Sequence, residues 1–212
     1  MADQAVNNKD LPEPKSDNPR IIRTAKIMGG TLVSLALAEA LDLYRTFGLV
    51  LIREQLLAVI LGLALATVFV AKPFVRNAPR LHVPWYDLVA AILCFGACLY
   101  VAVFYLHIVD TLFERPVASV VAGTLIVAGV AECLRRTAGP LLFGFVLFFI
   151  AFGLVGHLIP GHFQGRNVDI DRLMIYVGLD SNGSIGLPIG VVVSIVIAFI
   201  FFGSLLNASG GS

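Results

Sequence analysis

Two carboxylates inside an apolar segment are the first candidates for chemistry in this chain. Glu39 and Asp42 lie three residues apart near the end of the run 25–44, so a helix would place them on one face. A carboxylate within the bilayer is costly and by default suggests a function, such as a proton relay or coupling to an ion. The alternative is that both lie at the membrane interface and pair there with Arg45. Glu39 is the deeper of the two and therefore the stronger candidate for a coupling role.

A second charged cluster closes the apolar run 117–134. Glu132 precedes Arg136 by four residues, which is the favourable orientation for an ion pair on a helix, and Arg135 lies beside it. Arginines at the end of a span also set its orientation, because Lys and Arg are enriched on the cytoplasmic side. The pattern predicts a topology anchor with one internal ion pair.

Histidines and cysteines supply the remaining candidate ligands. His107 and His157 each lie near the end of an apolar run, and two histidines at similar depth on different helices could bind a haem iron. The alternative is that each is a polar side chain satisfied at the interface. Cys94, Cys98 and Cys133 fall within apolar runs with no His or carboxylate cluster beside them, so we expect them to pack as small hydrophobes. We therefore predict no metal site and no cofactor.

The elements that would hold these residues are membrane-spanning helices. Apolar residues make up 58% of the chain and charged residues only 14%, with a mean hydropathy of +0.90, whereas soluble domains are about 45–50% apolar. A bilayer core about 30 Å thick needs about 20 helical residues. We predict an all-α integral membrane bundle of about six transmembrane helices. The expected spans are residues 25–44, 54–71, 86–108, 117–134, 140–159 and 186–206.

Polar segments flank and separate these spans. Residues 1–23 are rich in polar residues and proline and are expected to form a disordered cytoplasmic tail. Residues 161–185 are expected to form an extracytoplasmic loop, in which Asp169, Asp171 and Arg172 begin a short amphipathic helix at the interface or docked on the bundle. A cytoplasmic N-terminus places most of the 15 Lys and Arg residues inside, so this orientation is favoured.

The net charge of +1 and the absence of known catalytic motifs limit the functions that the chain can have. A charge near zero gives no indication of a nucleic-acid partner. The sequence contains no HExxH, GxSxG or CxxC motif and no Gly-rich phosphate loop with a lysine. We therefore expect neither nucleic-acid binding nor enzymatic activity.

Glycine and proline residues lie just before and within the last apolar run, residues 186–206. Pro188 suits the first turn of a helix, Gly183 suits a flexible entry, and Gly186 lies between them. Gly203 lies near the end of the same run, before Asn207 and a Ser-Gly-Gly sequence. In transporters, segments interrupted by Gly and Pro can open helix ends toward a substrate or an ion. We predict helix breaks at Gly183, Gly186, Pro188 and Gly203.

Several stretches of this chain resemble one family of membrane transporters. They are LDLYRTFG (41–48), PWYDLVAAILCFGACLYVAVFY (84–105), AECLRRTAGPLLF (131–143), and GHLIPGHFQG followed by RLMIYVGLDSNGSIGLPIGVVVSIVIAFIFFGSLLNASGG (within 156–211). Together they are similar to the N-terminal part of the fused membrane component of tripartite ATP-independent periplasmic (TRAP) transporters. In that component a small four-helix subunit is joined to a twelve-helix subunit. The resemblance covers about residues 25–211 and is most specific from Glu132 to Gly211.

The resemblance implies a scaffold role in a bacterial inner membrane. Residues 24–160 would form a scaffold-like bundle, and residues 186–212 the first helix of a larger transport domain whose remainder the chain does not contain. The family imports carboxylate-type solutes, driven by a sodium or proton gradient and delivered by a periplasmic solute-binding protein. The implied partners are the lipid bilayer, the remainder of the large transport subunit and that binding protein. The family's ion sites lie further along, so no ion or substrate ligand is assigned here.

We therefore expect a fragment or split-gene product that is not transport-competent alone. Two alternatives stay open. One is a stand-alone membrane assembly protein without a transport role. The other is a haem-binding electron-transfer subunit that uses His107 and His157.

Overall fold

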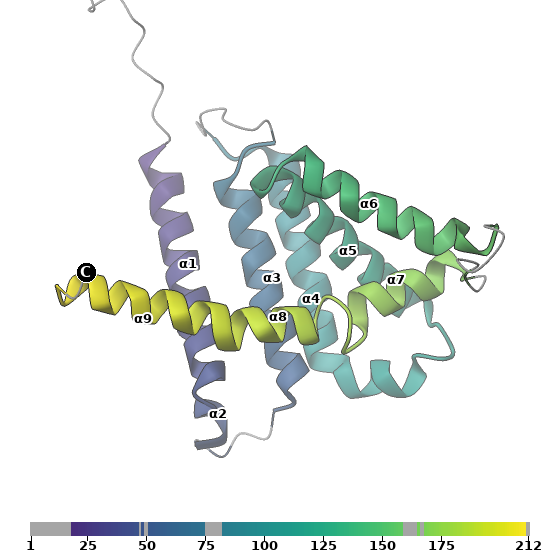
Figure 1. The fold of residues 1–212 in the computed structure, drawn as a ribbon, viewed down its shortest axis with the longest axis horizontal. Helices are drawn as coiled ribbons and strands as arrows, with labels where there is room; N and C mark the ends of the chain where they lie inside the picture. The colour runs from purple at the N-terminus through teal and green to yellow at the C-terminus, as the bar shows by residue number, and fades with distance from the viewer. Residues whose placement is uncertain are drawn as a thin grey trace, which may run out of the picture.

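Helices form all of the regular structure in the described part of the chain. The computed structural model describes residues 18–46, 48, 51–74, 82–158, 165 and 168–210. The elements, in chain order, are α1 (Pro19–Ala40), α2 (Leu43–Thr46), α3 (Arg53–Ala71), α4 (Trp85–Thr111), α5 (Val117–Thr137), α6 (Pro140–Val155), the 3₁₀ turn η1 (Gly156–Leu158), α7 (Ile170–Leu179), α8 (Leu187–Val191), the π-helical turn η2 (Val192–Val196) and α9 (Ile197–Ala208) (Figure 1). This confirms the predicted all-α fold.

Five helical segments of the described chain are long and apolar enough to cross a membrane. They are α1, α3, α4, α5 and the continuous segment Leu187–Ala208, which comprises α8, η2 and α9. We call this last segment the crossing helix, because it runs across the upright helices of the bundle (Figure 1). These segments make the chain a multi-pass membrane protein, as predicted. The span predicted at residues 140–159 is not among these five, because its helix α6 has 16 residues and is followed by η1 at Gly156. That length is short of the about 20 residues that a bilayer core requires.

The first helix begins earlier and ends earlier than its apolar run. The Asn18 side chain accepts a hydrogen bond from the Arg20 amide at 3.0 Å, and Pro19 takes the first helical position. Both are favoured at a helix start. Residues 19–23 are therefore helical, which corrects the predicted tail of residues 1–23; residues 1–17 lie outside the described part. α1 ends at Ala40, and Asp42 adopts a left-handed conformation with φ 56°.

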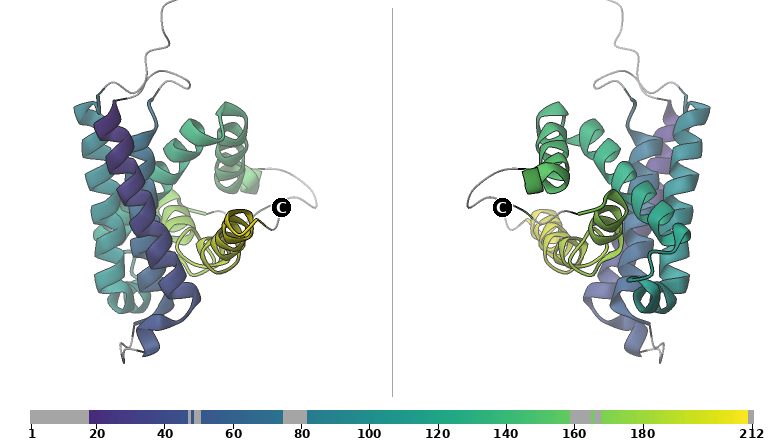
Figure 2. Two further views of the ribbon diagram at one scale, coloured as in Figure 1. Left: turned by 90° about the vertical axis from the view of Figure 1, so that its left-hand side faces the viewer. Right: turned by 90° about the vertical axis from the view of Figure 1, so that its right-hand side faces the viewer.

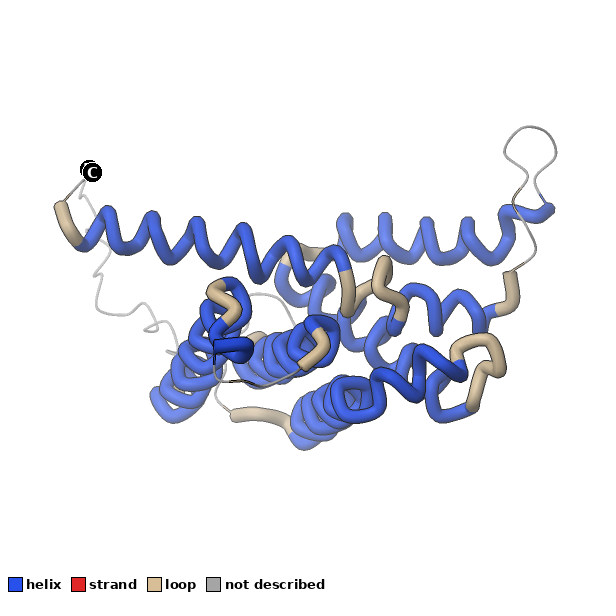
Figure 3. Tube along the Cα trace, turned by 90° about the horizontal axis from the view of Figure 1, so that it is seen from below, coloured by secondary structure: helices blue, strands red, loops and turns tan. Residues whose placement is uncertain are grey.

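The helices form two layers with different directions. α1, α3 and α4 stand side by side, whereas α6 and the crossing helix run across them (Figures 1 and 2). Seen from below, the upright helices are nearly end-on and the other two lie along one side (Figure 3). α3 packs against α1, α4 and α5, and α7 packs on α5. The last apolar segment therefore crosses the bundle and does not run parallel to the earlier spans.

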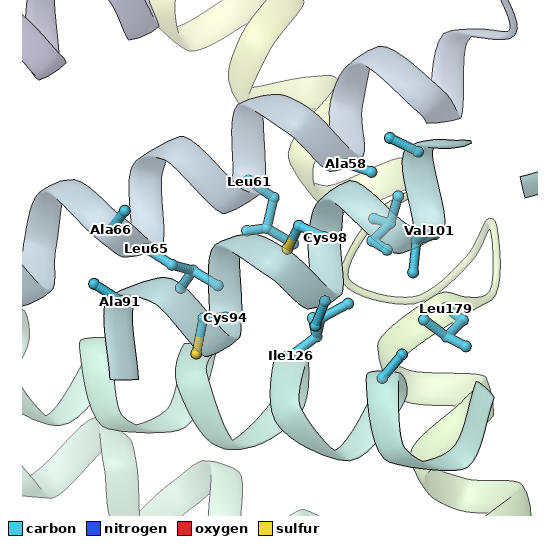
Figure 4. Close-up of a cluster of buried hydrophobic side chains, with 14 of the residues drawn as sticks. Ala58, Leu61, Leu65, Ala66, Ala91, Cys94, Cys98, Val101, Ile126 and Leu179 are labelled. Atoms are coloured by element: carbon cyan, nitrogen blue, oxygen red, sulfur yellow. The ribbon is translucent and has the colours of Figure 1, made fainter. Parts of the chain in front are cut away.

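Small residues bring α3, α4 and α5 close together at the core. A Cβ atom on Gly62 of α3 would lie 2.8 Å from the Cβ of Cys98 on α4. A Cβ atom on Gly129 of α5 would lie 2.6 Å from the sulfur of Cys94. Cys94, Cys98 and Cys133 are buried free thiols, and the first two lie among apolar side chains between the helices (Figure 4). They pack as small hydrophobes, as predicted, in the close contacts that small residues permit in membranes.

A glycine contact docks the short helix α7 onto α5. A Cβ atom on Gly178 of α7 would lie 2.7 Å from the carbonyl oxygen of Gly123 on α5. A Cβ atom on Gly123 would in turn lie 2.7 Å from the carbonyl oxygen of Met174. The two backbones therefore touch. The amphipathic helix predicted near residue 170 is therefore docked on the bundle, which is one of the two positions expected for it.

A single methyl group at the α5–α7 contact should destabilise the fold. Gly178→Ala places a Cβ against backbone that cannot rotate away, so we expect a loss of about 1–3 kcal/mol in unfolding free energy. Gly203→Ala is the matched control, because a Cβ atom at that position of α9 would meet no neighbouring element within 4 Å. It should be neutral or stabilising by up to about 1 kcal/mol, because Ala favours helix. Thermal unfolding in detergent micelles measures both, and equal shifts would contradict this account of the contact.

Candidate functional site

Four charged side chains meet where α3 ends, α4 begins and α5 ends. Asp87 lies in the first turn of α4, and Arg135 and Arg136 lie in the last turn of α5, with Glu132 one turn earlier. We call these four residues the arginine cluster. Two guanidinium groups and two carboxylates make the cluster electrically neutral, which is the condition for placing charges where water is scarce.

Arg136 connects three helices through one guanidinium group. Its Nη2 donates to Asp87 Oδ1 at 2.8 Å, and its Nε donates to Glu132 Oε1 at 2.8 Å. Its Nη1 donates to the carbonyl oxygen of Lys72, directly after α3, at 3.2 Å. The Arg136 side chain is 3% exposed and that of Asp87 is 1% exposed. In such a site an ion pair is screened far less than at the surface.

Arg135 completes the cluster from its outer side. Its Nε and Nη2 donate to the two oxygens of Glu132 at 2.8 and 2.7 Å, which is the bidentate geometry that arginine favours with carboxylates. The guanidinium carbons of Arg135 and Arg136 lie 4.2 Å from the ring centre of Phe74 and 4.9 Å from that of Phe69, respectively. Cation–π contacts of this kind add to the stability of partly buried arginines.

The sequence predicted three of the four residues of this cluster, but only one of its ion pairs. The i, i+4 pair of Glu132 and Arg136 is present, but it is not the only internal pair, because Asp87 joins it from α4. Asp87 was not predicted as a member of this cluster from the sequence. Its one available signal was an acidic residue in the first turn of a span, where the helix dipole favours negative charge. Its partner lies 49 residues away, and no periodicity connects the two.

A second ion pair joins α1 to the start of α3. Arg53 Nε donates to Glu39 Oε1 at 2.7 Å, and the Glu39 side chain is 4% exposed whereas that of Arg53 is 49% exposed. The second oxygen of Glu39, Oε2, is buried and makes no hydrogen bond with the described residues. Glu39 is therefore a carboxylate buried in the bundle, and its partner is Arg53 on the neighbouring helix α3.

The expected common face of Glu39 and Asp42 is not formed. α1 ends at Ala40 and the left-handed Asp42 turns the chain away, so Asp42 pairs at the exposed end with Arg45, with 3.4 Å between Oδ2 and Nη1. There the neighbouring Asp42 carboxylate raises the pKa of the Tyr44 phenol. The expected pairing with Arg45 is thus present for Asp42, whereas Glu39 pairs with Arg53.

The crossing helix passes close to the Glu39–Arg53 pair. A Cβ atom on Gly190 would lie 3.6 Å from Nη2 of Arg53, so the guanidinium lies against the α8 backbone. Arg53 lines a cavity of about 170 Å³ together with Ser181 and Ser194. In the adjoining contact, Val193 of η2 is fully buried within a cluster of Ala36, Leu57 and Ile60. The residues that position the crossing helix are therefore those that surround the ion pair.

The predicted helix breaks divide into three that the structure contains and one that it does not. Pro188 lies in the first turn of α8. Gly183 and Gly186 lie in the connection from α7, where a Cβ atom would collide with the carbonyls of Tyr176 and Ser181, respectively. Their role is close approach of backbone and not flexibility. Gly203 lies inside α9, which continues to Ala208, so the chain does not break there.

The two candidate haem ligands are not brought together in a described contact. His107 is exposed on α4, which packs against α3 and α5. His157 lies in η1, and its Nδ1 is 3.0 Å from the carbonyl oxygen of Leu154 in its own turn. Within the described ranges, no group of three or more His, Cys, Asp and Glu side chains is arranged to hold a metal ion.

The geometry of the arginine cluster and of the Glu39–Arg53 pair suits the joining of helices. The Glu39–Arg53 pair joins α1 to α3. Arg136 of α5 joins α4 through Asp87 and the end of α3 through the Lys72 carbonyl. Comparisons with protein-family models, with curated proteins and with solved structures found no match.

Neutralising Asp87 should weaken the fold far more than neutralising an exposed aspartate. Asp87→Asn leaves the Arg136 charge buried with less compensation, so we expect a loss of about 3 kcal/mol in unfolding free energy. Asp42→Asn is the matched control, because the Asp42–Arg45 pair is exposed and should contribute less than about 1 kcal/mol. Thermal unfolding of both variants in the same detergent measures the difference. Similar losses would contradict the central role of the buried pair.

The two partners of the second ion pair should respond unequally to substitution. Arg53→Gln leaves the buried Glu39 carboxylate unpaired and should cost about 2–3 kcal/mol, whereas Glu39→Gln leaves a half-exposed arginine that solvent can reach and should cost about 1 kcal/mol. The double variant should be more stable than Arg53→Gln alone, because the unpaired charge is then gone. Equal costs for the two single variants, measured by unfolding in detergent, would refute this asymmetry.

Proposed function

We propose that this chain is the membrane scaffold portion of a TRAP-type secondary importer of carboxylate-type solutes. The observation that carries the proposal is the combination of a bundle braced by ion pairs and an apolar helix that crosses it and is largely uncovered. In this role the chain acts by holding a transport domain in the membrane and not by enzymatic chemistry. The resemblance of residues 25–211 to the fused permease component supplies the transport class.

The crossing helix has one anchored part and one uncovered part. Its η2 turn is anchored by the buried Val193, whereas α9 contains no buried residue. Phe199, Ile200 and Phe202 are each more than half exposed. In a membrane, such a surface contacts either lipid or a further apolar helix. We assign α9 to the contact with the remainder of the large transport subunit.

The braced bundle suits a fixed frame for a moving domain. Breaking a buried ion pair costs several kcal/mol, so α1, α3, α4 and α5 resist rearrangement relative to one another. In the proposed transporter, the moving parts lie in the remainder of the large subunit, a sodium or proton gradient drives import, and a periplasmic binding protein delivers the solute. The frame gives these parts a constant position in the bilayer.

The proposed location is the bacterial inner membrane with a cytoplasmic N-terminus. The start of α1, the end of α3 and the arginine cluster lie at the same end of the bundle (Figure 1). This end carries Arg20, Arg23 and Lys26 in addition to Arg135 and Arg136. Concentrated Lys and Arg favour the cytoplasmic side.

Photocrosslinking in cells that contain the complete transport system tests the proposal. A photoreactive phenylalanine analogue at Phe199 of α9 should yield an adduct with the large transport subunit, while the same analogue at Ile92, a similarly exposed position of α4, should not. Deleting the gene for this chain should abolish gradient-driven uptake of carboxylate solutes that depends on the binding protein. Normal uptake in the deletion strain, or no protein adduct at Phe199, would overturn the proposal.

A further inference from the structure

A pocket between the end of α4 and the helix α7 contains side chains of both charges. Its volume is about 290 Å³, at the lower end of the range for small-molecule sites. Leu112, Phe113 and Ile175 form its apolar walls. Arg115, Arg172, Tyr176 and Asp180 supply its polar groups. The lining is therefore amphipathic and contains two cations and one anion.

The charges that remain uncompensated in this pocket are one cation and one anion. Arg115 is neutralised by Asp169, with 2.7 Å between Nη1 and Oδ2. Arg172 makes no ion pair with any residue that the structure describes. Asp180 accepts hydrogen bonds from the amide groups of Asn182 but pairs with no cation in the same ranges. A ligand that complements the pocket carries a negative and a positive group.

The apolar surroundings of this pocket suit a position at the edge of the hydrocarbon layer. Phe113 is 91% exposed, and Val117, Leu106 and Ile170 nearby in the chain are each more than half exposed. Such apolar side chains are stable in contact with lipid chains, whereas the arginines and Asp180 need a polar environment. The boundary between the two is the depth at which lipid headgroups lie.

We infer that this pocket binds the headgroup of a zwitterionic phospholipid that carries a primary ammonium, such as phosphatidylethanolamine. The Arg172 guanidinium holds the phosphate, because arginine is well suited to phosphate oxygens. The Asp180 carboxylate accepts from the ammonium, and Leu112 and Phe113 contact the glycerol and the upper acyl chains. An anionic lipid would leave Asp180 without a partner and add repulsion. This site does not depend on the transport role proposed above.

Headgroup selectivity distinguishes the proposed lipid from other ligands. The full chain is purified in detergent, stripped of lipid, and titrated by native mass spectrometry with phosphatidylethanolamine, phosphatidylcholine and phosphatidylglycerol. Phosphatidylethanolamine should bind best, because the trimethylammonium of phosphatidylcholine offers Asp180 no N–H donor. Equal binding of the three lipids, or a preference for phosphatidylglycerol, would overturn the inference. Soluble phosphoethanolamine binding as tightly as the lipid would show a free-phosphate site and overturn it as well.

Two substitutions in the pocket separate the roles of its charges. Arg172→Gln should weaken phosphatidylethanolamine binding about tenfold, the effect of losing one charge-assisted contact. Asp180→Asn should remove the preference for phosphatidylethanolamine over phosphatidylcholine while leaving binding of the phosphate in place. Arg45→Gln is the matched control on an exposed arginine outside the pocket and should leave both affinities unchanged. Thermal unfolding verifies that each variant is folded, and a folded Arg172→Gln variant with unchanged affinity would refute the site.

Discussion

The burial of one guanidinium group determines how this bundle is arranged. Arg136 lies where water is scarce, so its charge must be neutralised and its donors must be satisfied by the protein. Asp87 and Glu132 supply the negative charge, and the Lys72 carbonyl oxygen accepts a hydrogen bond from Nη1 of Arg136. Because these groups come from the start of α4, from α5 and from the end of α3, one residue holds three helix ends together. Removing Asp87 should destabilise the fold by more than the net contribution of its ion pair, because the buried charge of Arg136 is then left without full compensation.

The helix α3 is held in this way at both ends. Arg53, its first residue, pairs with Glu39 of α1, and Lys72, which follows its last residue, accepts from Arg136 of α5. Between these ends, Gly62 allows a close approach to α4. α3 is therefore the central helix of the bundle, and the positions of α1, α4 and α5 follow from their contacts with it. α7 then depends on α5 through the glycine contact at Gly123.

Features set by composition or by neighbouring residues could be predicted from the sequence, whereas those set by distant partners could not. Hydropathy indicated the helical membrane class, and the i, i+4 spacing indicated the Glu132–Arg136 pair, because both are local properties. The pairing of Glu39 with Arg53 was missed because Arg53 lies on another helix, 14 residues along the chain. The common face of Glu39 and Asp42 was wrongly expected because the apolar run gives no sign that the helix ends between them. Gly203 was misread because glycine weakens a helix but does not end it when the chain on both sides favours helix. The shortness of α6 was not visible in an apolar run that included residues beyond the helix.

The direction of the crossing helix has a local cause that the sequence alone does not reveal. Its π-helical turn places Val193 into the contact with α1 and α3, where it is fully buried. At that turn the Ser194 hydroxyl donates to the Gly190 carbonyl at 2.6 Å, so a backbone acceptor near the irregular turn is satisfied without water. Gly190 has no side chain to displace Arg53, which keeps the α1–α3 ion pair intact beneath the crossing. The anchored part of the crossing helix thus belongs to the frame, and α9 extends from it with no buried residue. A further membrane element could pack on α9 and move without disturbing the ion pairs, which is the division between fixed and moving parts that a scaffold role requires.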